Sequence, residues 1–186
     1  MATIERKIAN AEKMCGPIWS CIDEVERACF QRVLKQLQDA RVGVQHFAPS
    51  TGYGYDDIGR DTLEKVYAGV MGCESALVRP QIVSGTHALA VALFGLLAPG
   101  KRLLSAVGKP YDTLEKVIGI GGQYDGSLAA WGVAYDQAEL TSEGKPDVAA
   151  IGASLRGDTA VVLVQRSRGY DWRSSLSLEQ IAQICA

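Results

Sequence analysis

The sequence lacks the features that mark membrane, secreted and nucleic-acid-binding proteins. Its longest apolar run, residues 88–98, is broken by Gly95 and is too short to cross a bilayer. The first thirteen residues are charged where a signal peptide needs an apolar stretch, which favours a cytoplasmic protein. A net charge of −2, with acids and bases interspersed, offers no basic surface to a phosphate backbone. We therefore expect neither a membrane nor a nucleic acid as partner.

Cysteine pairs and metal-binding patterns are also missing. The cysteines are five, an odd number, with no C-x-x-C pair and no histidine at metal-ligand spacing. We expect reduced thiols and no metal site. Small buried apolar side chains are the favoured interpretation, and a reactive or metal-binding cysteine is the alternative. The residues concerned are Cys15, Cys21, Cys29, Cys73 and Cys185.

Two common nucleotide-binding motifs are absent. The chain contains no G-x-x-x-x-G-K-[ST] sequence. The stretch GIGGQYDG fails G-x-G-x-x-G because Tyr124 stands at the last position and a predicted helix precedes it. ATP and NAD are therefore poor candidates, although a phosphate carried by a different cofactor is not excluded.

Helical periodicity dominates the amino-terminal part. Apolar residues recur at steps of three and four from Ile18 to Leu37, which predicts an amphipathic helix. Pro49 and several glycines indicate a loop over residues 41–59 that carries two tyrosines. A second helix is expected over residues 61–71. We assign residues 1–58 to an N-terminal helical segment with its loop, and residues 59–186 to the first part of an α/β domain.

Strands and helices alternate after Gly72, which predicts an α/β domain with a mainly parallel sheet and helices on both faces. The apolar run AVVLV is typical of a central strand that is covered on both faces. The last helix leads to no further strand, so the predicted sheet looks unfinished. Expected strands are 76–78, 81–83, 102–107, 132–140 and 159–165, and expected helices are 86–97, 111–118, 146–155 and 178 onward.

The turn Ser84-Gly85-Thr86 is a candidate anion site. It precedes a helix, whose first backbone N–H groups lack internal partners and carry the positive end of the helix dipole. Gly85 lets a ligand approach the backbone, and the hydroxyls of Ser84 and Thr86 can hydrogen-bond to a phosphate. A purely structural turn is the alternative, and His87 on the same first turn is favoured as a structural residue.

Further candidates follow two other predicted strands. Tyr111 lies at a carboxyl end, where open α/β sheets gather ligands, and its ring could stack on a flat cofactor. Beyond the AVVLV strand, Arg166, Arg168 and Arg173 could clamp a substrate carboxylate through paired hydrogen bonds. Packing for Tyr111, and ion pairs or surface positions for the arginines, are the alternatives.

Four ordered blocks of the chain carry a resemblance to a known family. They are STGYGYDDIGRDTLEKVYA, ALVRPQIVSGTHALAVALFGLL, GKPYDTLEKVIG and VQRSRGYDWRSSL. Together they resemble the amino half of the methionine gamma-lyase-like family, often labelled aluminium resistance proteins. Members are fold-type-I enzymes that use pyridoxal 5′-phosphate and are relatives of cystathionine lyases. The resemblance implies a carbon–sulfur lyase that performs β- or γ-elimination on a sulfur amino acid, as a homodimer or homotetramer with shared active sites.

The resemblance also implies roles for individual residues. Ser84, Gly85 and Thr86 would hold the cofactor phosphate. Tyr111 would stack on the pyridine ring and carry a proton to the leaving group. In the relatives, a loop from a neighbouring subunit brings a tyrosine and an arginine to the phosphate. Tyr55 matches the tyrosine, but Asp57 occupies the arginine position and adjacent Arg60 is the candidate replacement.

The lysine that forms a Schiff base with the cofactor lies beyond residue 186 in the resembled family. Lys109 matches no lysine motif of that family. We therefore expect this chain to be an incomplete portion that is inactive alone. One alternative is a non-catalytic cofactor-binding or interaction module that pairs with a complementary chain. Another is a pyridoxal-phosphate enzyme of aldolase or aminotransferase type, because SGT before an alanine-rich helix also resembles threonine aldolases.

Overall fold

The computed structural model describes residues 2–51, 54–122, 124–169 and 172–186. These residues form two compact units, residues 1–81 and 82–186. The predicted domain boundary between residues 58 and 59 stays a prediction, because a compact unit need not coincide with a domain that folds alone.

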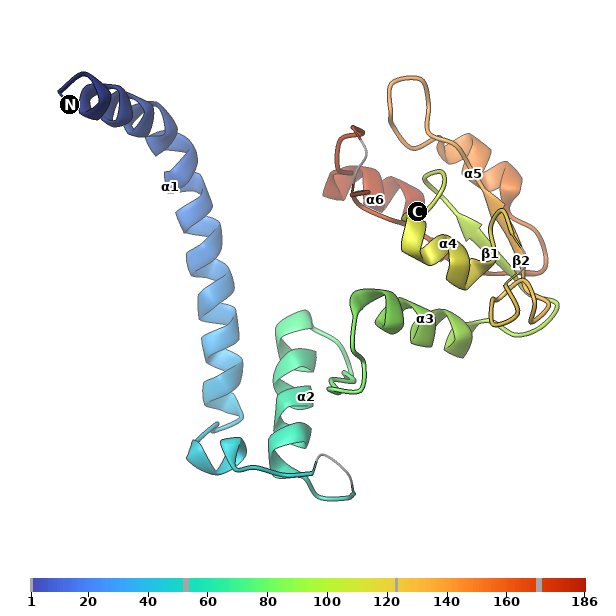
Figure 1. Ribbon diagram of the computed structural model, residues 1–186, viewed down its shortest axis with the longest axis horizontal. Coiled ribbons are helices and arrows are strands. Elements are labelled where there is room, and N and C mark those ends of the chain that lie inside the picture. Colours follow the sequence, from blue (N-terminus) through green and yellow to red (C-terminus); the bar gives the residue numbers. More distant parts are fainter. Residues whose placement is uncertain (1, 52–53, 123, 170–171) are drawn as a thin grey trace. The chain divides into compact units, whose positions relative to one another are not determined.

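The first unit is helical, and the periodicity predicted the later part of its first helix and most of its last one. Helix α1 spans Ala2–Asp39, a short 3-10 helix η1 spans Val44–Phe47, and α2 spans Ile58–Met71. The carboxyl-terminal part of α1 lies beside α2 (Figure 1). The Asp57 side chain accepts a hydrogen bond from the Arg60 amide and so caps α2, which ends at Gly72 in the left-handed conformation.

The second unit is a three-stranded parallel sheet with helices, in the order β2-β1-β3. The α/β class and the parallel pairing are therefore confirmed. The predicted helices are confirmed too, with ends shifted by one or two residues. The elements, shown in Figure 1, are α3 (Gly85–Leu96), β1 (Arg102–Ser105), α4 (Asp112–Ile118), β2 (Ala134–Gln137), α5 (Val148–Ser154), β3 (Thr159–Leu163) and α6 (Leu178–Cys185).

Helices cover both faces of the sheet because side chains on β1 alternate. Leu103 and Leu104 are both fully buried but point to opposite faces. Leu103 belongs to a core with residues of α3 and α4, whereas Leu104 belongs to a core with residues of α5 and α6. The carboxyl ends of the parallel strands are thereby held at one edge, where the candidate site begins.

Three sequence expectations were wrong. Residues 76–78 and 81–83 are not strands; instead the Val78 amide donates to the Glu64 carboxylate on α2, at 2.9 Å, rather than to a neighbouring strand. Among the described strands β1, not the AVVLV segment, is central, and Val162 of β3 is 40% exposed. The cysteines are free thiols, but none of the five is buried. The expectation that they are buried is therefore wrong, since Cys15 is partly exposed and the other four are exposed.

Candidate functional site

The amino terminus of α3 has the open donors that an anion needs. Ser84 precedes the helix and its Oγ accepts from the His87 amide at 3.1 Å. The amides of Gly85 and Thr86 donate to no acceptor in the part of the chain that the structure describes. The Ser84 oxygen accepts the capping hydrogen bond through a lone pair. Its O–H group can therefore still donate to a ligand oxygen.

Open space lies beside Gly85. A Cβ built at this position would meet no atom within 4 Å. The protein's own packing therefore does not require glycine there, and the position leaves room for a ligand to reach the backbone. The donors, the free space and the positive end of a twelve-residue helix fit a phosphate group.

His87 and Thr113 support this turn from either side. The Val83 amide donates to His87 Nδ1 at 3.4 Å. This contact agrees with the structural role that was favoured for His87 from the sequence. Thr86 Oγ1 lies 2.9 Å from Thr113 Oγ1 on α4. Thr113, which sequence reasoning did not single out, therefore orients the Thr86 hydroxyl.

A hollow of about 410 Å³ joins three of the sequence-predicted functional residues. It lies between the start of α3, the start of α4 and the carboxyl end of β3. The Thr86 hydroxyl, an aromatic ring and a guanidinium group thus line one cavity whose remaining wall is largely apolar. Its lining residues are Thr86, Leu89, Tyr111, Thr113, Leu114, Leu163, Val164, Gln165 and Arg166.

Tyr111 is held in this hollow by residues that follow β3. Its amide donates to Gln165 Oε1 at 3.0 Å, and the Gln165 side chain also donates to the Ser167 carbonyl at 2.9 Å. A Cβ at Gly169 would come within 3.1 Å of Tyr111 Cε2. Gln165 and Gly169 therefore position the tyrosine. A polar residue at the carboxyl end of an apolar predicted strand was the sequence signal that could have identified Gln165.

The structure separates the arginines after β3. Arg166 lines the hollow with Tyr111, and its Nε donates to the Leu176 carbonyl at 3.2 Å. Arg168 and Arg173 line a second, smaller hollow of about 190 Å³ together with Lys109 and Glu139. Arg166 is thus the arginine best placed to meet a ligand that also contacts Tyr111.

Lys109 is engaged in the second hollow. Its Nζ pairs with Glu115 at 2.8 Å, and Arg168 lies 4.0 Å from the other oxygen of the same carboxylate. No lysine is among the described residues that line the larger hollow. These contacts do not place Lys109 for reaction with a cofactor aldehyde bound beside Tyr111.

Tyr135 on β2 differs from Tyr111 in its environment. Burial raises the pKa of Tyr135 to about 12, although a hydrogen bond with Ser105 opposes the rise. Its hydroxyl donates to Gln137 Oε1 at 2.8 Å. Tyr135 therefore serves as a half-buried hydrogen-bond donor to Gln137.

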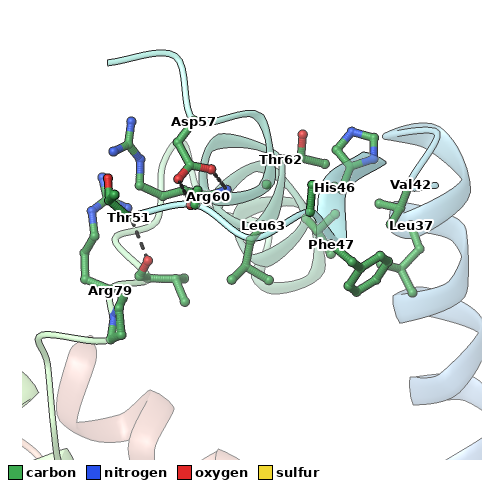
Figure 2. Close-up of a pocket in the computed structure, with 16 residues that line it drawn as sticks. Leu37, Val42, His46, Phe47, Thr51, Asp57, Arg60, Thr62, Leu63 and Arg79 are labelled. Carbon is green, nitrogen blue, oxygen red and sulfur yellow. Dashed lines mark hydrogen bonds between the residues drawn. The ribbon is translucent and has the colours of Figure 1, made fainter. Parts of the chain in front are cut away.

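The first unit has a hollow of its own, of about 460 Å³, that contains Arg60 (Figure 2). Figure 2 shows Asp57, Arg60 and Arg79 at one end and Leu37 and Phe47 at the other. A hydrogen bond from the Arg60 amide is the main cause that lowers the pKa of Asp57, and the Ser50 hydroxyl adds to it.

The two predicted cofactor residues of this unit differ in their contacts. Arg60 donates from Nη1 to the Gly54 carbonyl at 2.8 Å and pairs through Nε with Asp61 at 2.9 Å. These bonds tie its guanidinium to the loop. Tyr55 is 98% exposed, whereas the neighbouring tyrosine of the motif, Tyr53, lies outside the described residues.

Comparison with known proteins identifies the family. A family model described as methionine gamma-lyase matches residues 4–186. The chain belongs to the methionine gamma-lyase family. The resemblance stated from the four sequence blocks is thereby confirmed.

Individual relatives agree with this assignment. An uncharacterized protein YnbB of Bacillus subtilis is 49% identical over 182 residues, which are 97% of this chain and 42% of that protein. A solved structure from Clostridium novyi, named a carbon-sulfur lyase involved in aluminum resistance, is 41% identical with a TM-score of 0.90, over 99% of this chain and 44% of that one. A structure from Listeria innocua, provisionally named a cystathionine beta-lyase involved in aluminum resistance, is 44% identical with a TM-score of 0.91, over 98% and 44%. This member of the family thus spans less than half the length of these relatives.

Two kinds of feature are absent from the described residues. No helix there is both long and apolar enough to cross a membrane. No group of three or more histidine, cysteine, aspartate or glutamate side chains could hold a metal ion there.

Proposed function

We propose that this chain forms the phosphate-binding and ring-facing part of a pyridoxal-phosphate-dependent carbon–sulfur lyase. The observation that carries the proposal is the hollow that joins Thr86, on the first turn of α3, with Tyr111 and Arg166. Family membership supports it, as does the name of the Clostridium novyi relative. When bound, pyridoxal phosphate would accept electron density from the bonds at the Cα of an amino acid.

The chain's own residues would bind and orient the cofactor. The amides of Gly85 and Thr86, with the Ser84 hydroxyl, would hold the phosphate, and a dianion at this position would be stabilised by the helix dipole. Tyr111, fixed by Gln165 and Gly169, would lie against the pyridine ring. The apolar wall of Leu89, Leu114 and Leu163 would exclude water from that side of the ring.

Two side chains would act on the substrate. Arg166 has a guanidinium that can bind an amino-acid carboxylate in a paired geometry, and it borders the hollow of Tyr111. The Tyr111 hydroxyl would transfer a proton to the sulfur that leaves during β- or γ-elimination. Arg168 stays a second candidate for the carboxylate, from the neighbouring hollow.

Other groups would come from outside this unit. Tyr55 and Arg60 are proposed to reach the phosphate of a neighbouring subunit in a homodimer or homotetramer. Because Lys109 is paired with Glu115, we assign the Schiff base to a lysine in the part of the relatives' length that this chain does not cover, and we expect this chain alone to bind the cofactor without turnover.

A titration with pyridoxal phosphate tests the binding proposal. We expect saturable binding, followed by absorbance near 400 nm or by tyrosine quenching, and competition by inorganic phosphate. Pyridoxal, which lacks the phosphate, should bind at least about tenfold more weakly, because it forfeits charge-assisted hydrogen bonds. Equal affinity for both compounds would contradict the phosphate site.

Borohydride reduction and mass spectrometry then test the missing lysine. We expect no specific adduct on this chain and one adduct on a full-length relative. The full-length relative should release a thiol, ammonia and a keto acid from a sulfur amino acid. Release of an aldehyde from threonine instead would favour aldol cleavage, and a stoichiometric adduct at Lys109 would overturn the lysine assignment.

A further inference from the structure

Helices α3 and α4 pack against each other, but the larger hollow opens between their amino-terminal ends (Figure 1). Leu93 of α3 shares a buried core with Leu114 and Ile118 of α4. One turn earlier on α3, Leu89 is 46% exposed and lines the hollow instead. The core thus holds α4 against the second half of α3, and the first turn of α3 depends on other contacts.

One hydrogen bond joins the two helices beside the hollow. Thr86 Oγ1, on the first turn of α3, lies 2.9 Å from Thr113 Oγ1, on the first turn of α4. Within the residues that the structure describes, it is the only hydrogen bond between α3 and α4. Both side chains line the hollow with Tyr111, which directly precedes α4. The bond therefore connects the proposed phosphate site with the segment that carries the proposed ring contact.

The proton of this hydrogen bond can come from either threonine. Each hydroxyl has one O–H to donate and accepts through its lone pairs. If Thr86 donates to Thr113, Thr86 presents only lone pairs to an anion. If Thr113 donates, the Thr86 O–H stays available beside the open amides of Gly85 and Thr86. An anion at the start of α3 therefore selects the arrangement in which Thr113 donates.

We propose that Thr113 couples the two ends of the hollow, so that a phosphate at the start of α3 strengthens binding of the pyridine ring beside Tyr111. This inference rests on the proposed function, because it takes pyridoxal phosphate as the ligand. Thr113 acts on the phosphate through Thr86, which makes it a positioning residue.

Cooperativity within the chain of hydroxyls supplies the coupling. The bond between Thr86 and Thr113 is exposed in the free chain, where water competes for both hydroxyls. A phosphate bound to Thr86 polarises its hydroxyl and strengthens the bond from Thr113. Tyr111 lies two residues before Thr113, and its amide is already bound by Gln165. Fixing Thr113 thus orders the segment that carries the tyrosine ring, and a pyridine ring that binds afterwards meets an ordered surface.

Pyridoxal and phosphite, used as two separate pieces of the cofactor, test the coupling without turnover. Phosphite lacks one oxygen of phosphate, which leaves the ester position free for the hydroxyl of pyridoxal. Binding of pyridoxal to the whole chain is followed by absorbance or tyrosine quenching, with and without saturating phosphite. We expect phosphite to lower the dissociation constant of pyridoxal about three- to tenfold, the contribution of one hydrogen bond. Pyridoxal should lower the dissociation constant of phosphite by the same factor.

Three variants assign the coupling to Thr113. Thr113→Val removes the hydroxyl but keeps the shape of the side chain, so the factor should fall below about twofold. Thr113→Ser is the matched control, because it retains the hydroxyl and should retain the coupling. In a Thr86→Val background, adding Thr113→Val should not change the factor further, since the chain of hydroxyls is already broken. Circular dichroism and urea unfolding check that the variants fold alike.

A direct contact between phosphite and pyridoxal is the competing explanation. It would strengthen pyridoxal binding equally in Thr113→Val and in the unmodified chain, and that result would overturn the proposal.

The sign of the phosphite effect separates this coupling from the proposed function. Phosphite should compete with pyridoxal phosphate, because both occupy the start of α3, whereas it should favour pyridoxal. Competition without any gain for pyridoxal would leave the phosphate site intact and overturn the coupling alone. If phosphite does not compete with pyridoxal phosphate, the assignment of the phosphate to this turn is wrong, and the coupling through Thr113 is wrong with it.

Discussion

Replacing Gly85 with alanine separates a ligand-binding turn from a structural one. The added Cβ meets no protein atom within 4 Å, so the chain can accept it without rearrangement. Alanine is also favoured over glycine within a helix by up to about 1 kcal/mol. The free energy of unfolding of Gly85→Ala should therefore stay constant or rise slightly.

The effect on phosphate affinity has the opposite sign. A phosphate that approaches the amides of Gly85 and Thr86 would meet the new methyl group and lose or lengthen at least one hydrogen bond. A hydrogen bond to a charged group is worth about 1.5–3 kcal/mol, which corresponds to roughly a 10- to 100-fold loss in affinity. Gly85→Ala should thus keep or gain stability while it loses affinity for phosphate. A variant that is merely folded less stably would lose stability as well.

Gly95→Ala on the last turn of the same helix is the matched control. Its Cβ also meets nothing within 4 Å, but it lies at the opposite end of α3 from the proposed phosphate. Isothermal titration with pyridoxal phosphate and thermal unfolding are measured on both variants. Equal affinities in Gly85→Ala, Gly95→Ala and the unmodified chain would refute the assignment of the phosphate to this turn.

Three other perturbations follow from the contacts of the second unit. Gln165→Ala removes the acceptor of the Tyr111 amide and should shift the absorbance of bound pyridoxal phosphate while costing about 1–2 kcal/mol in urea unfolding; an unchanged spectrum would remove Gln165 from the site. Leu103→Ala, at a fully buried position, should cost about 2–5 kcal/mol in the same unfolding experiment, against well under about 1 kcal/mol for Val162→Ala on β3. Arg102 lowers the pKa of Asp158 through a hydrogen bond. The Asp158 carboxylate therefore stabilises the fold fully above its unfolded pKa of about 4. This contribution is lost as the pH falls through the lower pKa of the folded state. Thermal unfolding between pH 6 and pH 2 should accordingly depend less on pH in Asp158→Asn, and an identical profile would contradict this origin of acid sensitivity.

Local signals were sufficient for the helices and for part of the site. Periodicity located α1 and α2, and the turn at Ser84 was recognised because capping residues and an apolar helix follow each other within a few positions. Tyr111 was singled out because it follows a predicted strand, and the structure places it in one hollow with Thr86 and Arg166. These inferences depend on interactions between residues close in sequence, which a single chain displays directly.

Strand pairing was harder to predict, because it depends on distant residues. Residues 76–83 have strand-like composition, but the Val78 amide donates to the Glu64 carboxylate on α2. No local sequence pattern predicts this partner. The AVVLV run has the hydrophobicity of a central strand, yet it lies beside β1 at one side of the described sheet. Its position depends on how the segments between the strands pack, which the run itself does not encode. The support of Tyr111 by Gln165 spans 54 residues and was missed for the same reason.

The cysteines show that residue type alone does not predict burial. Free cysteine is usually a buried residue, but the structure shows Cys21 and Cys29 exposed on α1 and Cys73 exposed after the end of α2. Burial depends on what packs against the side chain, and this packing is set by residues that are distant in the sequence. The number and spacing of the cysteines carry no information about those residues.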